Sequence, residues 1–82
     1  MQIQKGHYYR NHWLQHVGNI IGDRVYVADF AGTSIVSREQ FMLWAKLEYT
    51  EVEAKTKFPR EYAEIEEAKA RFKPAIHEAQ PN

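Results

Sequence analysis

The first half of the chain alternates between short apolar stretches and turn signals, with a break roughly every ten residues. Stretches rich in Val, Ile and aromatic residues, bounded by Gly, Asn or Asp, are typical of antiparallel strands joined by tight turns. We therefore predict four strands, at residues 3–9, 13–21, 24–30 and 33–36. A fifth strand is predicted at 47–52, where apolar and polar positions alternate again.

Glycines and valines indicate how these strands turn and which side they bury. Gly22 occupies the first central position of a two-residue turn, as a type II′ hairpin requires. In the next strand Val25 and Val27 flank Tyr26, so we expect the valines to face the core and Tyr26 to face solvent. Gly18 interrupts the alternation of the preceding strand, which predicts a β-bulge there.

Two helices are expected after the fourth strand. Ser37 is followed three residues later by Gln40, a capping-box pair, and this predicts a short helix at 38–46. A longer helix is predicted at 59–73. It has a proline at its start, where the missing N–H would be unpaired anyway, and Pro74 at its expected end.

The second predicted helix carries an apolar stripe that needs a surface to pack against. Burial of a Phe or Ile side chain contributes roughly 1.5–3 kcal/mol, so a stripe of this kind is not expected to stay in water. The surface that covers it belongs either to its own strands, or to a second copy or a different protein. The residues of this docking face are Phe58, Tyr62, Ile65 and Phe72.

The order of elements, short strands with tight turns and one short intervening helix, resembles a small SH3-like barrel over residues 6–52. The resemblance implies a mainly β fold with α-helices: a small barrel or strongly bent antiparallel sheet, followed by a C-terminal helix. Domains of this shape bind peptides, proteins or nucleic acids. We divide the chain into a β-domain at 1–56, the helix at 57–76 and a frayed tail at 77–82.

Composition narrows the class of protein further. A chain of 82 residues, 44% hydrophobic and 27% charged, is expected to fold as one small globular domain. Eleven basic residues match eleven acidic ones, whereas dedicated nucleic-acid binders are usually basic. The chain has no cysteine, which excludes a disulfide framework and favours a reducing cytoplasm. No apolar stretch approaches the ~20 residues of a membrane span.

No catalytic or metal site is predicted. His12 and His16 are four residues apart, but along an extended strand their side chains would be about 13 Å apart, too far to share an ion. Ser34 and Ser37 are not part of a Gly-x-Ser-x-Gly elbow, and there is no glycine-rich phosphate loop. We therefore expect a protein that is not an enzyme and holds neither a metal nor a cofactor.

The best functional candidate is a set of aromatic and basic residues on three predicted strands. Because alternate side chains point to opposite faces, Arg24, Tyr26 and one of the adjacent pair Tyr8 and Tyr9 are expected to face solvent. Such a surface suits an extended peptide or stacked bases. The alternative is that these rings fill the core or lie under the C-terminal helix. The candidate partner-binding residues are Tyr8, Tyr9, Arg10, Trp13, Arg24 and Tyr26.

These observations predict a small cytoplasmic interaction module that binds a protein partner, with self-association into a homodimer as one form of that binding. The alternative is a nucleic-acid-binding accessory protein that uses the aromatic and basic strand face. Salt separates the two, because phosphate contacts release counterions and make the affinity fall steeply as salt rises.

Overall fold

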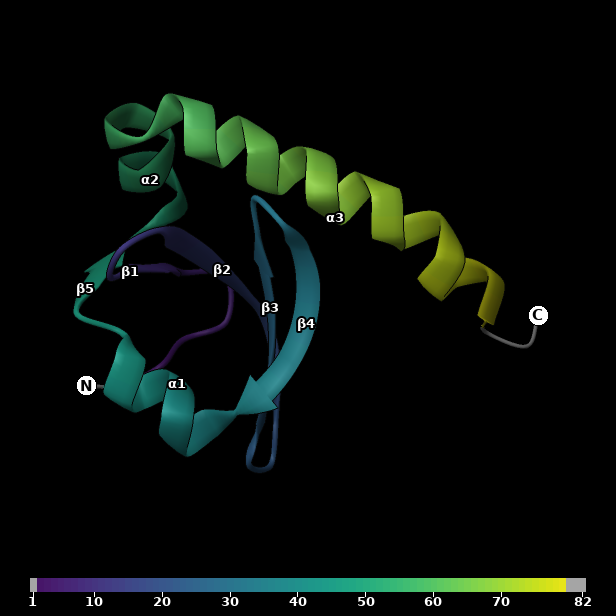
Figure 1. The fold of residues 1–82 in the computed structure, drawn as a ribbon, viewed down its shortest axis with the longest axis horizontal. Coiled ribbons are helices and arrows are strands. Elements are labelled where there is room, and N and C mark those ends of the chain that lie inside the picture. Colours follow the sequence, from purple (N-terminus) through teal and green to yellow (C-terminus); the bar gives the residue numbers. More distant parts are fainter. Residues whose placement is uncertain (1, 80–82) are drawn as a thin grey trace.

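The computed structural model describes residues 2–79, with side chains over 2–71, and contains five strands and three helices (Figure 1). The strands are β1 (Tyr8–Arg10), β2 (Leu14–Ile21), β3 (Arg24–Asp29), β4 (Gly32–Ser37) and β5 (Leu47–Tyr49). The helices are α1 (Arg38–Trp44), α2 (Glu51–Lys57) and α3 (Pro59–Ala79). The predicted mixed class of β-sheet and α-helices is confirmed.

The five strands form one antiparallel sheet in the order β4-β3-β2-β1-β5. The sheet is strongly curled, with α1 at the side where the chain passes from β4 to β5, while α2 and α3 lie on the outer side of the sheet (Figure 1). Its two edges are β4 and β5, and in residues 2–79 no strand pairing joins them. The structure therefore shows a strongly bent sheet, one of the two forms that the sequence predicts.

The hairpin and the strand polarity follow the predicted local rules. Gly22 has φ +59° in a two-residue turn between the paired residues Ile21 and Arg24, and no described non-glycine residue has positive φ. Val25 and Val27 are buried, whereas Tyr26 between them is 40% exposed, as predicted.

The predicted bulge is also present. The register of β2 against β3 shifts between Val17 and Asn19, on either side of Gly18. A Cβ added at Gly18 would lie 3.6 Å from the Tyr26 carbonyl oxygen, which is ordinary contact. The bulge keeps Val17 and Ile20 on the same side of the sheet.

Two apolar clusters lie on opposite sides of the sheet. The inner cluster, inside the bend and beneath α1, consists of Ile3, Tyr9, Val17, Val25, Val27, Phe41 and Ala45, with Ile20, Val36 and Trp44 at its margin. The outer cluster, beneath α2 and α3, consists of Tyr8, Leu14, Ala28, Ala54 and Ile65, with Tyr49, Phe58 and Tyr62 at its margin. The sheet is thus covered on both faces around β1.

The second half of the chain departs from the prediction in two elements. The strand expected at 47–52 ends at Tyr49, and α2 follows it. The cause is a capping box: the Thr50 side chain accepts from the Glu53 N–H, and the Glu53 carboxylate accepts from the Thr50 N–H. The first strand is also shorter than predicted, because a turn at residues 4–7, closed by a hydrogen bond from His7 N–H to Gln4 O, comes before it. This turn is tied to β2 through a hydrogen bond from Gly6 N–H to Val17 O.

The end of α3 differs from the prediction as well. The helix does not stop before Pro74 but continues to Ala79, in a stretch where helix-favouring residues stand on both sides of the proline: Ala, Arg and Lys before it, Ala and Glu after it. Part of the tail expected to fray therefore belongs to α3, and residues 80–82 lie outside the described chain. Among the described residues, no helix is both long and apolar enough to cross a membrane.

Candidate functional site

The N-terminal end of α3 is anchored where β1 turns into β2. The Glu61 carboxylate accepts hydrogen bonds from the Arg10 guanidinium and from the Leu14 N–H, the latter at 3.0 Å. The same guanidinium lies 4.4 Å from the centre of the Phe58 ring, within range of a cation–π contact. These contacts fix where α3 begins to cross the outer face of the sheet.

The docking face expected on α3 lies against the outer cluster of its own sheet. Ile65 is fully buried there, and Phe58 and Tyr62 are half-buried beside it. The Tyr62 hydroxyl donates a 2.7 Å hydrogen bond to Glu51 of α2. The fourth residue expected on this face, Phe72, lies outside the part of the chain whose side chains are described. The stripe is therefore covered by this chain itself as far as it can be followed.

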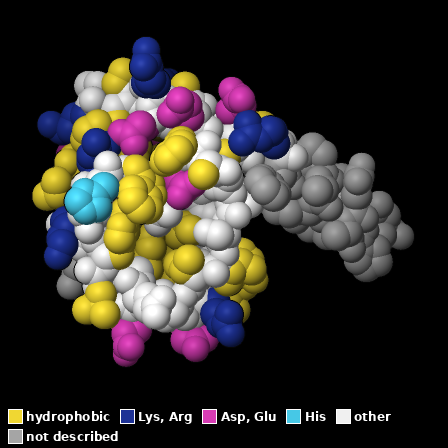
Figure 2. Space-filling view, viewed as in Figure 1, with side chains coloured by type: hydrophobic (Ala, Val, Ile, Leu, Met, Phe, Trp, Pro, Cys, Tyr) yellow, Lys and Arg dark blue, Asp and Glu magenta, His cyan; other side chains and the backbone are white. Residues whose placement is uncertain are grey.

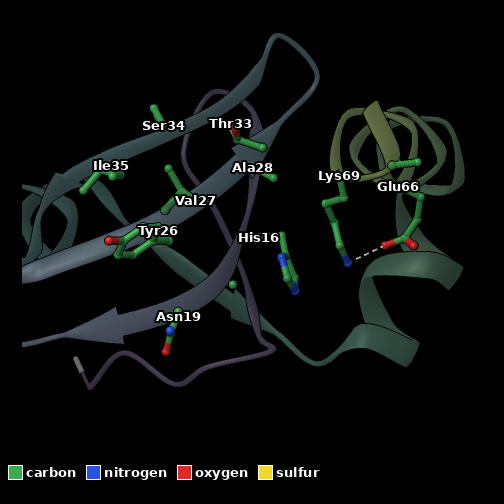
Figure 3. A pocket seen from close by; sticks show the side chains of 12 residues that line it. His16, Asn19, Tyr26, Val27, Ala28, Thr33, Ser34, Ile35, Glu66 and Lys69 are labelled. Atoms are coloured by element: carbon green, nitrogen blue, oxygen red, sulfur yellow. Dashed lines mark hydrogen bonds and ion pairs between the residues drawn. The ribbon is translucent and has the colours of Figure 1, made fainter. Parts of the chain in front are cut away.

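Further along α3, a groove of about 890 Å³ lies between the helix and β2, β3 and β4. The helix side is lined by Glu66, Lys69 and Ala70, and His16 lies on the sheet side facing them (Figure 3). The rest of the lining is mostly the outer surface of β3 and β4, including Tyr26 and Ile35. The groove therefore continues from the outer cluster along the same face of the sheet, where α3 no longer packs closely on the strands.

The charged groups of the groove are paired, and its imidazole is neutral at pH 7. Burial, with a smaller contribution from the Lys69 ammonium, lowers the pKa of His16 to about 4. The ring packs against Tyr8 with centroids 4.8 Å apart. Lys69 forms a 2.8 Å ion pair with Glu66, and this contact lowers the pKa of the Glu66 carboxyl. Burial is the main cause of the raised pKa of the Tyr8 hydroxyl.

The open end of the groove exposes apolar side chains and lies beside a sheet edge. Asn19, Tyr26 and Ile35 form one row across β2, β3 and β4, since each is paired with the next. Ile35 is 52% exposed and Ile21, at the end of β2, is 55% exposed. No described strand pairs with the far side of β4. We call Ile21, Tyr26, Ile35 and the unpaired edge of β4 the open end of the outer face.

Two of the predicted binding residues are buried. Tyr8 and Tyr9 both have no exposed surface, so the expectation that one of them faces solvent is wrong. The reason is that β1 lies inside the sheet, with α2 and α3 over one face and the inner cluster over the other. The expectation assumed that one face of the sheet is open to solvent at β1, and α2 and α3 cover that face.

The remaining predicted binding residues do not form one surface. Arg10 is held by Glu61 and Phe58, as described above. Trp13 is half-buried against Trp44, with ring centroids 5.3 Å apart, and its indole N–H is buried with no partner among the described residues. Of the six predicted binding residues, only Arg24 and Tyr26 are exposed together on the outer face.

Hydrophobic side chains also gather on the face that looks into the bend. Figure 2 shows them in a hollow that is framed by charged side chains.

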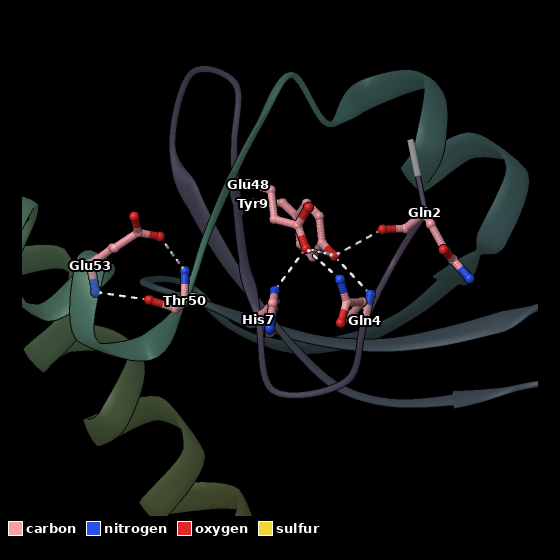
Figure 4. A network of polar contacts seen from close by, with 7 residues as sticks. All are labelled: Gln2, Gln4, His7, Tyr9, Glu48, Thr50 and Glu53. Carbon is pink, nitrogen blue, oxygen red and sulfur yellow. Dashed lines mark hydrogen bonds and ion pairs between the residues drawn. The ribbon is translucent and has the colours of Figure 1, made fainter.

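A polar network ties the N-terminal segment to β5 (Figure 4). The Tyr9 hydroxyl accepts from the Gln4 N–H at 2.7 Å and donates to the Glu48 carboxylate at 3.0 Å. The same carboxylate contacts His7 Nδ1 at 2.7 Å. Burial raises the pKa of Tyr9 to about 12, so its hydroxyl stays protonated as a donor. We assign this network a structural role.

The histidines and acidic residues are dispersed in the fold. His7 contacts Glu48, His12 lies beside Trp13, and His16 lies in the groove. Within the described residues, no three His, Cys, Asp or Glu side chains are grouped so that they could hold a metal ion. Comparison with protein-family models, with curated proteins and with solved structures found no match to this chain.

Proposed function

We propose that this protein is a small non-enzymatic interaction module that binds an extended segment of a protein partner at the open end of the outer face. One observation carries the proposal: a single sheet face is fully covered at one end by α3, but at the other end exposes apolar residues beside an unpaired strand. The exposed end combines a groove, an aromatic ring and free backbone groups. Peptide-binding domains use these same three features.

The geometry suits addition of a strand to the sheet. An extended peptide beside β4 gains backbone hydrogen bonds from the edge, and its alternate side chains enter the groove on the outer face. The volume of about 890 Å³ is within the ~300–1,000 Å³ of typical ligand sites. Tyr26 is the natural anchor, because tyrosines are enriched among the residues that dominate binding energy.

The chemistry of the groove favours binding over catalysis. A general base needs a reacting proton within reach and a pKa near the working pH, whereas the pKa of His16 is lowered to about 4. The carboxylate of the groove, Glu66, is paired with Lys69. These groups offer polar contacts at the closed end of a mostly apolar site.

The nucleic-acid alternative has less support. It depends on aromatic and basic residues that share one exposed surface, and Tyr8, Tyr9 and Arg10 are occupied within the fold. The exposed pair Arg24 and Tyr26 offers one cation and one ring, with Asp23 3.8 Å from that cation. We place the interaction in a reducing cytoplasm, which suits a chain without cysteine.

Photo-crosslinking in the native cells tests this function. Replacement of Tyr26 by p-benzoylphenylalanine places the reactive ketone on the outer face. The same replacement of Val52, which is 74% exposed on α2, is the matched control. We expect a discrete protein adduct from position 26 and none from position 52. Equal labelling at both positions would contradict the proposal, and an adduct removed by nuclease would favour the nucleic-acid alternative.

A further inference from the structure

We infer that the segment bound at the open end of the outer face is β4 of a second copy of this chain, so that two bent sheets join into one across a two-fold axis. This inference rests on the proposed function and names its partner. It is carried by the backbone groups of β4 that have no strand partner among the described residues, by the register that these groups allow between two copies, and by the absence of charged residues in β4.

The hydrogen-bond pattern of the β3–β4 ladder shows which residues of β4 direct their backbone groups away from β3. Arg38 N–H donates to Asp23 O at 2.7 Å, one step beyond the paired residues Arg24 and Ser37. In an antiparallel ladder alternate residues bond the same neighbour. Residues 32, 34 and 36 therefore direct their backbone groups toward β3, while the N–H groups of residues 33, 35 and 37 point away from the sheet.

The residues whose backbone groups point away from β3 are 33, 35 and 37, so Ile35 is the middle one of the three. A two-fold axis perpendicular to the sheet places the outer faces of the two copies on the same side. Since residues directly opposite each other point to the same face, the residue at the axis must lie opposite its own copy. With Ile35 at that position, Thr33 lies opposite Ser37 of the partner subunit, and both pairs are of the hydrogen-bonded kind. Tyr26 is the cross-strand neighbour of Ile35, so this register creates a continuous apolar row from the Tyr26 of one copy to that of the other.

Charge favours a second copy at this edge. Natural edge strands are commonly protected by Lys, Pro or inward-pointing charges, but β4 has the sequence Gly-Thr-Ser-Ile-Val-Ser with no charged residue. Two such edges meet without like charges facing each other, and the chain has zero net charge. In Figure 1, α3 crosses near the end of β4 that follows β3 and continues beyond the sheet.

A disulfide test exploits the absence of native cysteine. Hydrogen-bonded cross-strand pairs have Cα atoms about 5.5 Å apart, within the range that a disulfide spans. We expect Ile35→Cys to oxidise to a covalent dimer at least about ten times faster than Leu43→Cys, an exposed control on α1. Thr33→Cys should remain slow alone, since the two copies of residue 33 are offset by four residues, and should crosslink when mixed with Ser37→Cys.

Light scattering of the unmodified chain provides the second measurement. We expect a mass that rises with concentration toward twice 9.7 kDa. Ile35→Lys should stay at the monomer mass with an unchanged circular dichroism spectrum, because a lysine protects the edge without entering the core. A Leu43→Lys control should still dimerise.

A chain that stays monomeric at millimolar concentration, with Ile35→Cys crosslinking no faster than Leu43→Cys, would overturn the second copy as partner. The proposed function is decided separately by the adduct mass at position 26. An adduct of twice the chain mass supports both proposals. A nuclease-resistant adduct of any other mass retains the interaction module and overturns self-assembly.

Discussion

The two ends of the outer sheet face differ in what covers them rather than in their composition. At the covered end, Tyr8 and Leu14 are fully buried beneath Ile65 of α3. At the open end, Tyr26 and Ile35 point to the same side of the sheet but remain 40% and 52% exposed. Each end thus presents a tyrosine and an aliphatic side chain. One end therefore stabilises the fold, while the other keeps apolar side chains exposed.

The largest expected difference between the two ends is at their tyrosines. Tyr8→Ala should lower the free energy of unfolding by about 3–5 kcal/mol, because it leaves a cavity under α3. Tyr26→Ala should cost well under that, and less than Val27→Ala in the inner cluster. Denaturant titration of the three variants checks the order. A Tyr26→Ala loss as large as that of Tyr8→Ala would show that the open end is structural.

Two isoleucines provide the same test with identical chemistry. Ile65→Ala should cost about 2–5 kcal/mol, because Ile65 is fully buried, and it should lower helix content as α3 loosens. Ile35→Ala should cost about 1 kcal/mol or less, the range of β-propensity at an edge. Denaturant titration and circular dichroism measure both effects. Equal losses would remove the distinction between covered and open ends.

Substitution of Glu61, which anchors α3 at the covered end, should have an intermediate effect on the free energy of unfolding. Glu61→Gln weakens the contacts of the carboxylate with Arg10 and the Leu14 N–H, and we expect a loss of about 1–3 kcal/mol. Glu64→Gln, on the exposed side of the same helix, is the control and should change stability little. Thermal unfolding of both variants measures the difference. A Glu61→Gln variant as stable as the control would mean that apolar packing alone holds α3.

The smallest expected effect concerns pH at the boundary between the two ends. The pKa of His16 falls from 6.5 to about 4 on folding, so the unfolded chain binds a proton that the folded chain excludes. Stability from this residue is complete above pH 6.5 and falls as the pH drops toward 4. Wild type should therefore lose more stability than His16→Gln between pH 7 and pH 5. Parallel pH profiles would show that His16 is solvated in the folded state.

The sequence predicted the turns, strand faces and helix caps that depend on neighbouring residues in the chain. The glycine turn at Gly22 and the inward valines of β3 follow from positive φ and from side-chain alternation. The Ser37 hydroxyl caps α1 by accepting from the Gln40 N–H at 3.3 Å. The sequence also contained a signal for α2 in Thr50 and Glu53, but alternation in the same stretch favoured a strand.

The candidate site could not be predicted in the same way. The groove joins His16 and Ile35 of the sheet to Lys69 of α3, residues whose proximity depends on where α3 crosses the sheet. That crossing depends on Glu61, which is 47 residues from its partner Leu14 and carries no local signal. The burial of both Tyr8 and Tyr9 has the same origin, since alternation predicts two faces but not that both are covered.

The most direct test of the open end as a binding surface measures stability and binding in one variant. Ile35→Asp, introduced into the chain with the photo-crosslinker at position 26, puts a charge on the open end without touching the covered end. We expect the free energy of unfolding to change by no more than about 1 kcal/mol while the adduct disappears. An adduct that persists at wild-type yield on a folded Ile35→Asp chain would contradict the assignment of the open end as the binding surface.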